Sequence, residues 1–283
     1  MITVLEVIKL STEYLGKREI ESPRVNAEIL LADILNCKRI DLYLSFDKPL
    51  TENELQLYRE SLKKRVSRIP MQYIIGNVDF YGLKLLVNES VLIPRPETEL
   101  LVENVIMDLK EKSNLKILDI GSGSGNITLS LAKNLNSSFV TGIDVSEKAI
   151  EVATQNKILN DIPNAEFKLL DVMNDDLSIL EKFDVLVSNP PYISSDEFNY
   201  LEPELKVYEP RIALTDNSDG LSFYKKIISL AKNILNVPGY LYFELGKNQC
   251  KEVNEMMLIE NLSNIKISKD YAGIERIIYG ELR

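Results

Sequence analysis

The chain has 283 residues, of which 45% are hydrophobic and 27% are charged, a balance typical of globular proteins and not of disordered ones. It contains no histidine, which excludes histidine-based metal sites, nucleophile–histidine pairs and an imidazole general base. We expect no metal site. The net charge is −10, and strongly acidic surfaces repel phosphate backbones, which argues against a nucleic-acid substrate.

The first helix-like segment carries Glu6 and Lys9 within its apolar stretch, so it does not have the pattern of a signal peptide. No segment approaches 18 uncharged apolar residues, the length needed to cross a membrane. The two cysteines, Cys37 and Cys250, lie far apart in sequence, which favours two reduced thiols over a disulfide. We therefore expect a cytoplasmic protein without a membrane partner.

Residues 1–75 have the pattern of a small helical domain. Apolar residues recur at helical spacing in the segment that Pro23 opens, and a proline is common in the first turn of a helix. Thr51 is a candidate N-cap for the next helix. This region contains 12 Lys and Arg against 11 Asp and Glu, whereas the remainder contains 21 against 32. The acidic excess thus lies outside the helical domain.

A β-like pattern follows, with a turn expected at Tyr81-Gly82. We interpret residues 76–93 as a β-hairpin linker and residues 94–283 as a separate domain. Short apolar runs there alternate with helical stretches, which is typical of a parallel α/β sheet covered by helices on both faces. These runs are 116–120, 139–143, 167–170, 184–188 and 240–245.

The last two strand-like runs, 265–268 and 274–279, are joined only by a short turn at 270–273. Two strands this close together must pair antiparallel. The predicted fold class is therefore α/β, with a doubly wound sheet of the methyltransferase type that closes with an antiparallel C-terminal strand pair, plus the small N-terminal helical domain.

A glycine-rich turn follows the first strand of this domain in the segment ILDIGSGSGN. Its G-x-G-x-G spacing at Gly121, Gly123 and Gly125 permits a tight turn and close approach of the backbone to a ligand. Asn126 stands where a dinucleotide fingerprint would have its third glycine, and the Gly-Lys pair of a phosphate-binding loop is missing. The ligand of this loop is therefore not expected to be a pyrophosphate.

Two further strands end in acidic residues. Asp144 lies nineteen residues after Gly125 and is placed to accept hydrogen bonds from two ribose hydroxyls. Asp171 ends the third run, where it could accept from the amino group of an adenine, with Val172 beside the ring. Because ligands bind at the carboxyl ends of such strands, these groups predict one nucleoside-binding edge.

The tetrapeptide Asn189-Pro190-Pro191-Tyr192 ends the fourth strand. Two prolines fix the backbone and remove two N–H donors, which leaves the Asn189 side chain and the Pro190 carbonyl as rigid acceptors. Both could bind the hydrogens of one planar NH2 group and align its nitrogen with an electrophilic methyl group. Tyr192 is predicted to supply an aromatic wall. These four residues are the predicted catalytic residues.

On these motifs the chain resembles the peptide chain release factor glutamine methyltransferases. The likeness covers nearly the whole chain and includes RIPMQYIIG, LIPRPETELLVE, EPRIALTDNSDGLSFYKKI and the closing KDYAGIERIIYGEL. It implies an N-terminal helical bundle, a hairpin linker and a doubly wound domain. It also implies methylation, with S-adenosyl-L-methionine, of the side-chain amide of the glutamine in the Gly-Gly-Gln loop of translation termination factors.

The resemblance assigns the cofactor to Gly121, Ser122, Gly123, Ser124, Gly125, Asp144, Asp171, Val172 and Asn189, and it assigns the glutamine to Asn189 through Tyr192. It also places Asp119 and the segment 95–98 along the same cleft. Release factors are the implied protein partners, without direct binding of nucleic acid, and we expect a monomer.

Two alternatives stay open from the residues alone. Asn-Pro-Pro-Tyr also occurs in enzymes that methylate amino groups of adenine or guanine in DNA or ribosomal RNA, which share the planar NH2. The acidic charge of the catalytic region and the lack of a basic arm argue against them. The second alternative is a non-catalytic protein that binds S-adenosylmethionine, against which the intact tetrapeptide argues.

Overall fold

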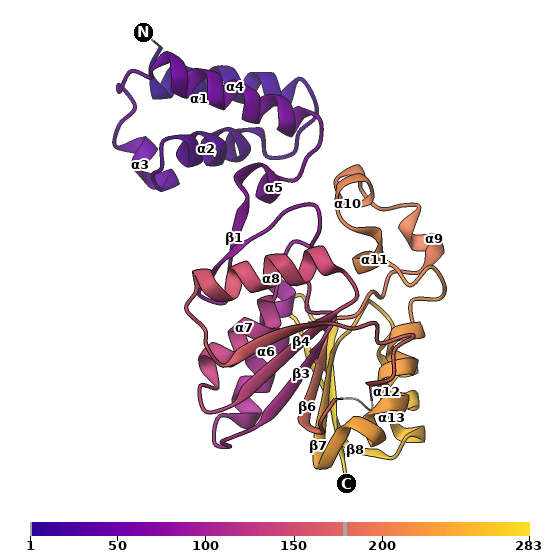
Figure 1. Cartoon of the computed structure of the whole chain (residues 1–283). Coiled ribbons are helices and arrows are strands. Elements are labelled where there is room, and N and C mark those ends of the chain that lie inside the picture. Colours follow the sequence, from indigo (N-terminus) through magenta and orange to yellow (C-terminus); the bar gives the residue numbers. More distant parts are fainter. Residues whose placement is uncertain (1, 178–179) are drawn as a thin grey trace. The chain divides into compact units, whose positions relative to one another are not determined.

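The computed structural model describes residues 2–177 and 180–283 (Figure 1). Their contacts divide the chain into two compact units. The helical unit comprises the residues up to Gly76 together with Pro203–Tyr208, and the catalytic unit comprises Asn77–Glu202 and Glu209–Arg283. This division differs from the predicted one, because the hairpin clusters with the catalytic unit and the segment 203–208 clusters with the helical unit.

The helical unit is a bundle around a core of aliphatic side chains and Tyr58. Thr3 and Thr51 each close a capping box with the glutamate three residues later, and the helix after Thr51 begins where the sequence predicts. The helices are α1 (Val4–Gly16), α2 (Pro23–Ile34), α3 (Arg39–Tyr43), α4 (Glu52–Val66), α5 (Met71–Ile75) and α10 (Pro203–Tyr208).

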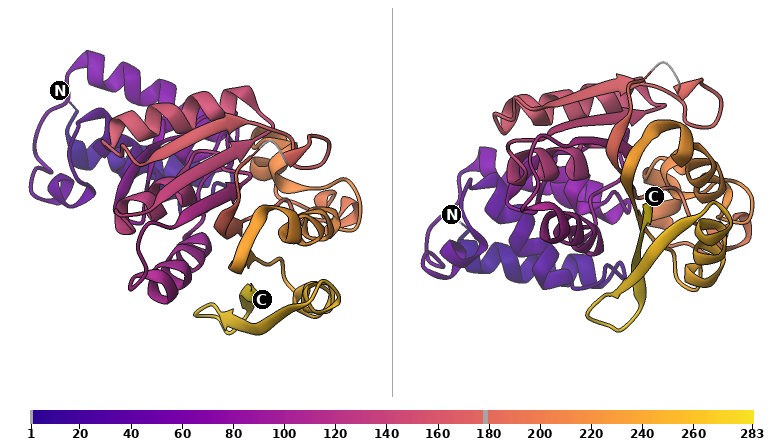
Figure 2. Two further views of the ribbon diagram at one scale, coloured as in Figure 1. Left: turned by 60° about the horizontal axis from the view of Figure 1, so that its bottom comes forward. Right: turned by 90° about the horizontal axis from the view of Figure 1, so that it is seen from below.

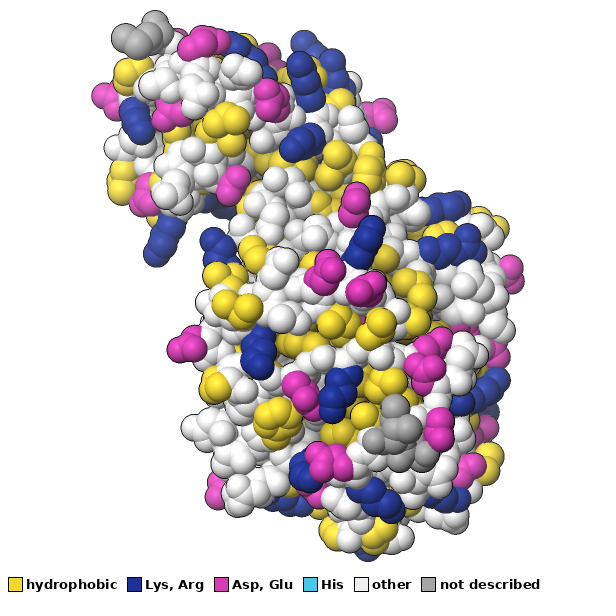
Figure 3. Space-filling view, viewed as in Figure 1, with side chains coloured by type: hydrophobic (Ala, Val, Ile, Leu, Met, Phe, Trp, Pro, Cys, Tyr) yellow, Lys and Arg dark blue, Asp and Glu magenta, His cyan; other side chains and the backbone are white. Residues whose placement is uncertain are grey.

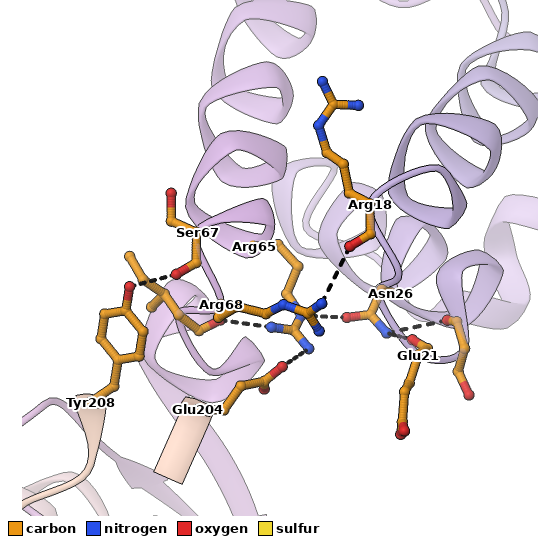
Figure 4. Close-up of polar contacts among 10 residues, drawn as sticks. Arg18, Glu21, Asn26, Arg65, Ser67, Arg68, Glu204 and Tyr208 are labelled. Atoms are coloured by element: carbon orange, nitrogen blue, oxygen red, sulfur yellow. Dashed lines mark hydrogen bonds and ion pairs between the residues drawn. The ribbon is translucent and has the colours of Figure 1, made fainter. Parts of the chain in front are cut away.

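A buried arginine of α4 joins α10 to this bundle (Figure 4). The Arg65 guanidinium donates to Asn26 Oδ1 at 2.7 Å, to the Ile69 carbonyl at 3.2 Å and to Glu204 Oε1 at 2.7 Å. The Tyr208 hydroxyl donates to the Ser67 carbonyl. Because the Arg65 side chain is only 8% exposed, its charge depends on these partners for compensation, and they explain why 203–208 belongs to this unit.

The hairpin consists of β1 (Asn77–Phe80) and β2 (Leu83–Leu86), joined at the predicted turn. Phe80 and Leu85 are buried in the same cluster as the sheet and its helices. The Asn156 side chain also pairs with the Leu86 backbone, accepting from its N–H at 2.6 Å and donating to its carbonyl at 3.0 Å. These contacts make the hairpin an integral part of the catalytic unit.

The described strands of the catalytic unit form a sheet in the order β5-β4-β3-β6-β7-β9-β8. Their bounds are β3 (Lys116–Ile120), β4 (Phe139–Asp144), β5 (Ala165–Leu169), β6 (Phe183–Ser188), β7 (Leu235–Glu244), β8 (Leu262–Lys269) and β9 (Glu275–Leu282). The first five are parallel, and β9 pairs antiparallel with β7 and β8. The predicted fold class, including the antiparallel C-terminal pair, is confirmed.

Helices cover both faces of this sheet (Figure 2). Side chains of α6 (Pro96–Leu109) and α7 (Asn126–Asn134) pack with the hairpin on one face, and those of α12 (Ser222–Ile234) and α13 (Cys250–Ile259) pack on the other. The remaining helices are α8 (Glu147–Leu159), α9 (Ser195–Phe198) and α11 (Arg211–Leu214). β7 begins five residues before the predicted run, because Pro238 and Gly239 interrupt its apolar pattern.

Within 2–177 and 180–283, no helix combines the length and apolar character that crossing a membrane requires. Both cysteines are free thiols.

Candidate active site

A cavity lies at the carboxyl ends of β3, β4 and β6, which are neighbours or next neighbours in the sheet. It is lined by residues from the glycine loop, from the ends of β4 and β5, from the segment before α6 and from the tetrapeptide. The described lining residues include Pro94, Arg95, Thr98, Gly121, Ser122, Gly123, Ser124, Asn126, Asp144, Val145, Asp171, Val172, Met173, Asn189, Pro190, Pro191 and Phe223. The structure thus brings most of the predicted site residues together.

Gly125 is the exception in the glycine loop. It has a φ of +81° and precedes α7, but it is not among the described residues that line the cavity. A Cβ atom there would lie 2.8 Å from Phe167 Cζ and 3.2 Å from Ala153 Cβ. This glycine therefore allows α7 to pack closely against β5 and α8, and it acts on the cavity only through the shape of the loop.

The Asp144 carboxylate links the glycine loop to the end of β4. Its Oδ2 accepts from the Gly123 N–H and its Oδ1 from the Ser146 N–H, each at 2.9 Å. Burial raises its pKa, and these backbone donors oppose that rise. Because each carboxylate oxygen has a second lone pair, Asp144 can accept further hydrogen bonds from a guest with hydroxyl groups.

Asp171 and Val172 line the cavity at the turn after β5. The Asp171 side chain closes its own turn, accepting from the Met173 N–H at 2.8 Å and from Asn174 Nδ2 at 2.7 Å. Val172 is buried in the core beneath and offers an aliphatic surface. The turn therefore provides a carboxylate beside an apolar face, as a purine ring with an amino group requires.

Two buried hydroxyls of the loop lack partners. Ser122 and Ser124 are each 1% exposed, and no described group bonds to either Oγ. Both residues line the cavity. Since unpartnered buried hydroxyls cost free energy, they fit a polar guest that bonds to the loop. Together with Asp144 and Asp171, they suit a nucleoside that carries a polar side chain.

Asn189 lies where β6 ends, and its side-chain orientation is set by a hydrogen bond. Its Nδ2 donates to Thr98 Oγ1 at 3.2 Å, and no described donor bonds to its Oδ1. Asn189, Pro190 and Pro191 all line the cavity, whereas Tyr192 is not among the described lining residues. The Tyr192 hydroxyl donates to Glu244 Oε1 at 3.3 Å. Tyr192 therefore anchors the turn, and the aromatic wall expected of it is not part of this cavity.

The backbone of the tetrapeptide is clamped at its last residue. Gln249 Nε2 donates to the Tyr192 carbonyl at 2.9 Å. Gly220 has a φ of +79°, and a Cβ atom there would lie 2.3 Å from the same carbonyl oxygen. Only glycine permits this approach, so the DNSDG segment helps to hold the tetrapeptide in place.

Two acidic residues have roles that the motifs did not predict. Glu209 is buried and accepts from Arg95 Nη2 and from the Ile93 N–H. These bonds hold the segment before α6 that forms part of the cavity lining. Glu244, the last residue of β7, is 1% exposed, and burial raises its pKa to about 7. The signal that could have found Glu244 is an acid at the end of an otherwise apolar strand.

Asp119 was expected along the cleft, and this expectation is wrong. It is fully buried in β3, and it is not among the described lining residues. Its Oδ2 accepts from the Thr128 N–H at 3.1 Å and from Thr128 Oγ1 at 2.6 Å, because the start of α7 lies over it. Burial raises its pKa to about 7. It therefore supports the glycine loop and helix from beneath.

Two family models match the chain. The model described as the PrmC N-terminal domain matches residues 6–76, and the model described as a methyltransferase domain matches residues 111–274. Among solved structures, a methyltransferase from Pyrococcus furiosus aligns with a TM-score of 0.54 at 18% identity, covering 82% of this chain and 98% of that one. This likeness concerns the fold alone.

Curated relatives extend the match over both units. The release factor glutamine methyltransferase of Fusobacterium nucleatum is 45% identical, over 97% of this chain and 77% of the relative. That of Thermodesulfovibrio yellowstonii is 40% identical, over 89% of this chain and 90% of the relative. At such identity and coverage, the chain belongs to the release factor glutamine methyltransferase family.

Proposed function

We propose that this protein methylates the side-chain amide nitrogen of the glutamine in the Gly-Gly-Gln motif of peptide chain release factors, with S-adenosyl-L-methionine as the methyl donor. One observation carries the proposal. A single cavity is lined both by the glycine loop with its strand-end acids and by Asn189, whose NH2 is bonded to Thr98. The Asn189 carbonyl oxygen is thereby left to accept from an NH2 group of the acceptor.

The cofactor is assigned to the half of the cavity formed by 121–124, Asp144, Asp171 and Val172. Asp144 would accept from the ribose hydroxyls and Asp171 from the adenine amino group, while Val172 would pack against the ring. Ser122 and Ser124 would gain partners for their hydroxyls. When bound, the cofactor supplies a methyl group on a positively charged sulfur, which is an electrophile with a good leaving group.

The acceptor glutamine is assigned to the other half. Asn189 Oδ1 and the Pro190 carbonyl would each accept one hydrogen of its NH2 group, which orients the nitrogen lone pair toward the donor half. Prolines at 190 and 191 hold these acceptors rigid. Addition of a methyl group to the nitrogen must be accompanied by loss of one NH2 proton, which would leave along its hydrogen bond to Asn189 Oδ1 or the Pro190 carbonyl and pass to solvent. The chain has no histidine, so the residues of this site promote the reaction by orientation and by hydrogen bonds that hold the NH2 group in place.

A protein acceptor agrees with the charge of the chain better than a nucleic acid does. Acidic and basic side chains are interspersed on the face drawn in Figure 3, and the net charge is −10. The near-neutral helical unit is the part that we assign to contact with the release factor. Because release factors act on ribosomes, we place the reaction in the cytoplasm, and we propose that the enzyme works as a monomer.

The test offers the purified protein a release factor, DNA and ribosomal RNA side by side with labelled S-adenosylmethionine. We expect label in the release factor alone, and none in a release factor whose Gly-Gly-Gln glutamine is replaced by alanine. Label in a nucleic acid alone would instead favour the base-methylating alternative. A complete lack of transfer to all three, with the cofactor bound, would favour the non-catalytic one.

A further inference from the structure

A buried carboxylate lies directly behind the acceptor half of the cavity. Glu244 Oε2 accepts from Thr98 Oγ1 at 2.6 Å, and its Oε1 accepts from the Tyr192 hydroxyl at 3.3 Å. Both Glu244 and Thr98 are 1% exposed. An isolated carboxylate at such a place is costly, so these contacts are needed to keep it there. Glu244 is not among the described lining residues of the cavity, whereas Thr98 and Asn189 are.

The direction of each hydrogen bond follows from chemistry. An ionised carboxylate can only accept, so the single hydroxyl proton of Thr98 is committed to Glu244. The Thr98 oxygen is then left with lone pairs only, and it must accept from its other neighbour. That neighbour is Asn189, whose Nδ2 lies 3.2 Å from Thr98 Oγ1. The two ends of an asparagine amide have nearly the same shape, and this sequence of bonds distinguishes them.

We propose that Glu244 and Thr98 are positioning residues that fix the amide orientation of Asn189, with its NH2 group on Thr98 and its carbonyl oxygen available to the acceptor NH2. The inference rests on the proposed function for its catalytic consequence. With the amide reversed, an NH2 group would face the acceptor NH2, and two donors cannot bond to each other. The two hydrogen bonds from Asn189 to Thr98 and from Thr98 to Glu244 form a relay. This relay thus determines whether Asn189 can bind the acceptor at all.

The protonation state of Glu244 controls the relay. A neutral Glu244 could donate its proton to Thr98, which could then donate to Asn189 and favour the reversed amide. Burial raises the pKa of Glu244 to about 7, assisted by Glu97 and opposed by Thr98, Arg276 and Tyr192. From α12, the Tyr224 hydroxyl donates to the Glu244 backbone carbonyl at 2.8 Å. Lowering the pH through about 7 should therefore weaken the preference of the Asn189 amide for the orientation that leaves its carbonyl oxygen available.

The first test compares Thr98→Val with Thr98→Ser. Valine keeps the shape but removes the hydroxyl, whereas serine keeps the hydroxyl. We expect Thr98→Val to lower kcat about tenfold to hundredfold with an unchanged dissociation constant for S-adenosylmethionine, and Thr98→Ser to restore kcat to within about threefold of the wild type. A wild-type kcat in Thr98→Val would overturn the proposal, as would an equal loss in both variants.

The second test does not depend on the release factor. The side-chain NH2 group of Asn189 is observed by NMR in protein labelled with nitrogen-15 at asparagine, and it is assigned by its loss in Asn189→Ala. We expect its resonances to shift in Thr98→Val and to titrate near pH 7 in the wild type but not in Glu244→Gln. Unchanged resonances in Thr98→Val would overturn the inference even if methyl transfer occurs. Shifted resonances in a protein that methylates no release factor would keep the inference and reject the proposed function.

Discussion

The two halves of the cavity are built in different ways. The donor half comes from short segments of sequence, where the loop residues 121–124 and the ends of β4 and β5 present backbone groups, hydroxyls and carboxylates. The acceptor half is assembled from distant segments, since Thr98 and Glu244 are 146 residues apart in sequence. Each half has a buried acid beneath it, Asp119 and Glu244, whose pKa burial raises to about 7. Binding of the donor therefore depends on local segments of the chain, whereas orientation of the acceptor depends on long-range packing.

Asn189→Ala should separate the two halves most sharply. Loss of the acceptor oxygen should lower kcat for the release factor by about 100-fold or more, because the acceptor NH2 would no longer be oriented. Binding of S-adenosylmethionine, measured by calorimetry, should be preserved. Asn134→Ala is the control for a surface asparagine, because Asn134 lies in α7 and its side chain donates to the Ser130 carbonyl within the same helix. Transfer at the wild-type rate by Asn189→Ala would show that the acceptor assignment is wrong.

Asp144→Ala should have the opposite profile. We expect the dissociation constant for S-adenosylmethionine to rise about tenfold to hundredfold, because the hydrogen bonds to a charged acceptor are lost. The Asp144→Asn variant keeps one acceptor oxygen, so its dissociation constant for S-adenosylmethionine should lie between those of Asp144→Ala and the wild type. Calorimetry measures both constants. An unchanged value in Asp144→Ala would remove Asp144 from the donor half.

The two buried acids should differ in what their protonation affects. The pKa of Asp119 is about 7 in the folded protein, well above that of an unfolded aspartate. Between the two values the folded state holds a proton that the unfolded state releases, so this residue makes stability fall as the pH rises from about 4 to 7. Because asparagine does not ionise, the Asp119→Asn variant should not show this loss of stability with rising pH.

Denaturant unfolding at pH 5 and at pH 8 measures the effect. Relative to the wild type, the free energy of unfolding of Asp119→Asn should be larger at pH 8 than at pH 5 by on the order of 2 kcal/mol, so that the variant gains stability where Asp119 would ionise. Protonation of Glu244 should, in addition, lower kcat for methyl transfer to the release factor. An identical pH dependence of stability in Asp119→Asn and the wild type would contradict the buried-acid account of the donor half.

The smallest expected effect concerns the loop hydroxyls. Ser122→Ala and Ser124→Ala should each weaken binding of S-adenosylmethionine by about threefold to tenfold, the value of one neutral hydrogen bond. Ser130→Ala is the matched control, because its Oγ is also buried without a described partner but Ser130 is not a lining residue. Equal affinities in all three variants would mean that the loop binds its guest through backbone groups alone.

The donor half and the order of elements could be predicted from sequence because their signals are local. Glycine spacing, strand-end acids and capping residues act within a few residues of each other, and the strands β3, β4 and β6 were predicted within one residue at each end. The doubly wound fold followed from this alternation. The tetrapeptide was equally visible, because two prolines after a buried strand are a local signal.

The remaining features depend on packing between distant segments. Nothing near Tyr192 in sequence indicates that its hydroxyl bonds to Glu244, so the residue was expected to face the cavity. Asp119 was expected at the cleft because its strand leads there, but the start of α7 covers it. The hairpin was interpreted as a linker because the anchoring of β2 by Asn156 is also a long-range contact.

The most direct test of the central claim is mass spectrometry of a release factor after incubation with this protein and S-adenosylmethionine. We expect one added methyl group on the side-chain amide nitrogen of the Gly-Gly-Gln glutamine, and none when the enzyme is Asn189→Ala. A methyl group on any other residue, or an unmodified glutamine after incubation with active wild-type protein, would contradict it.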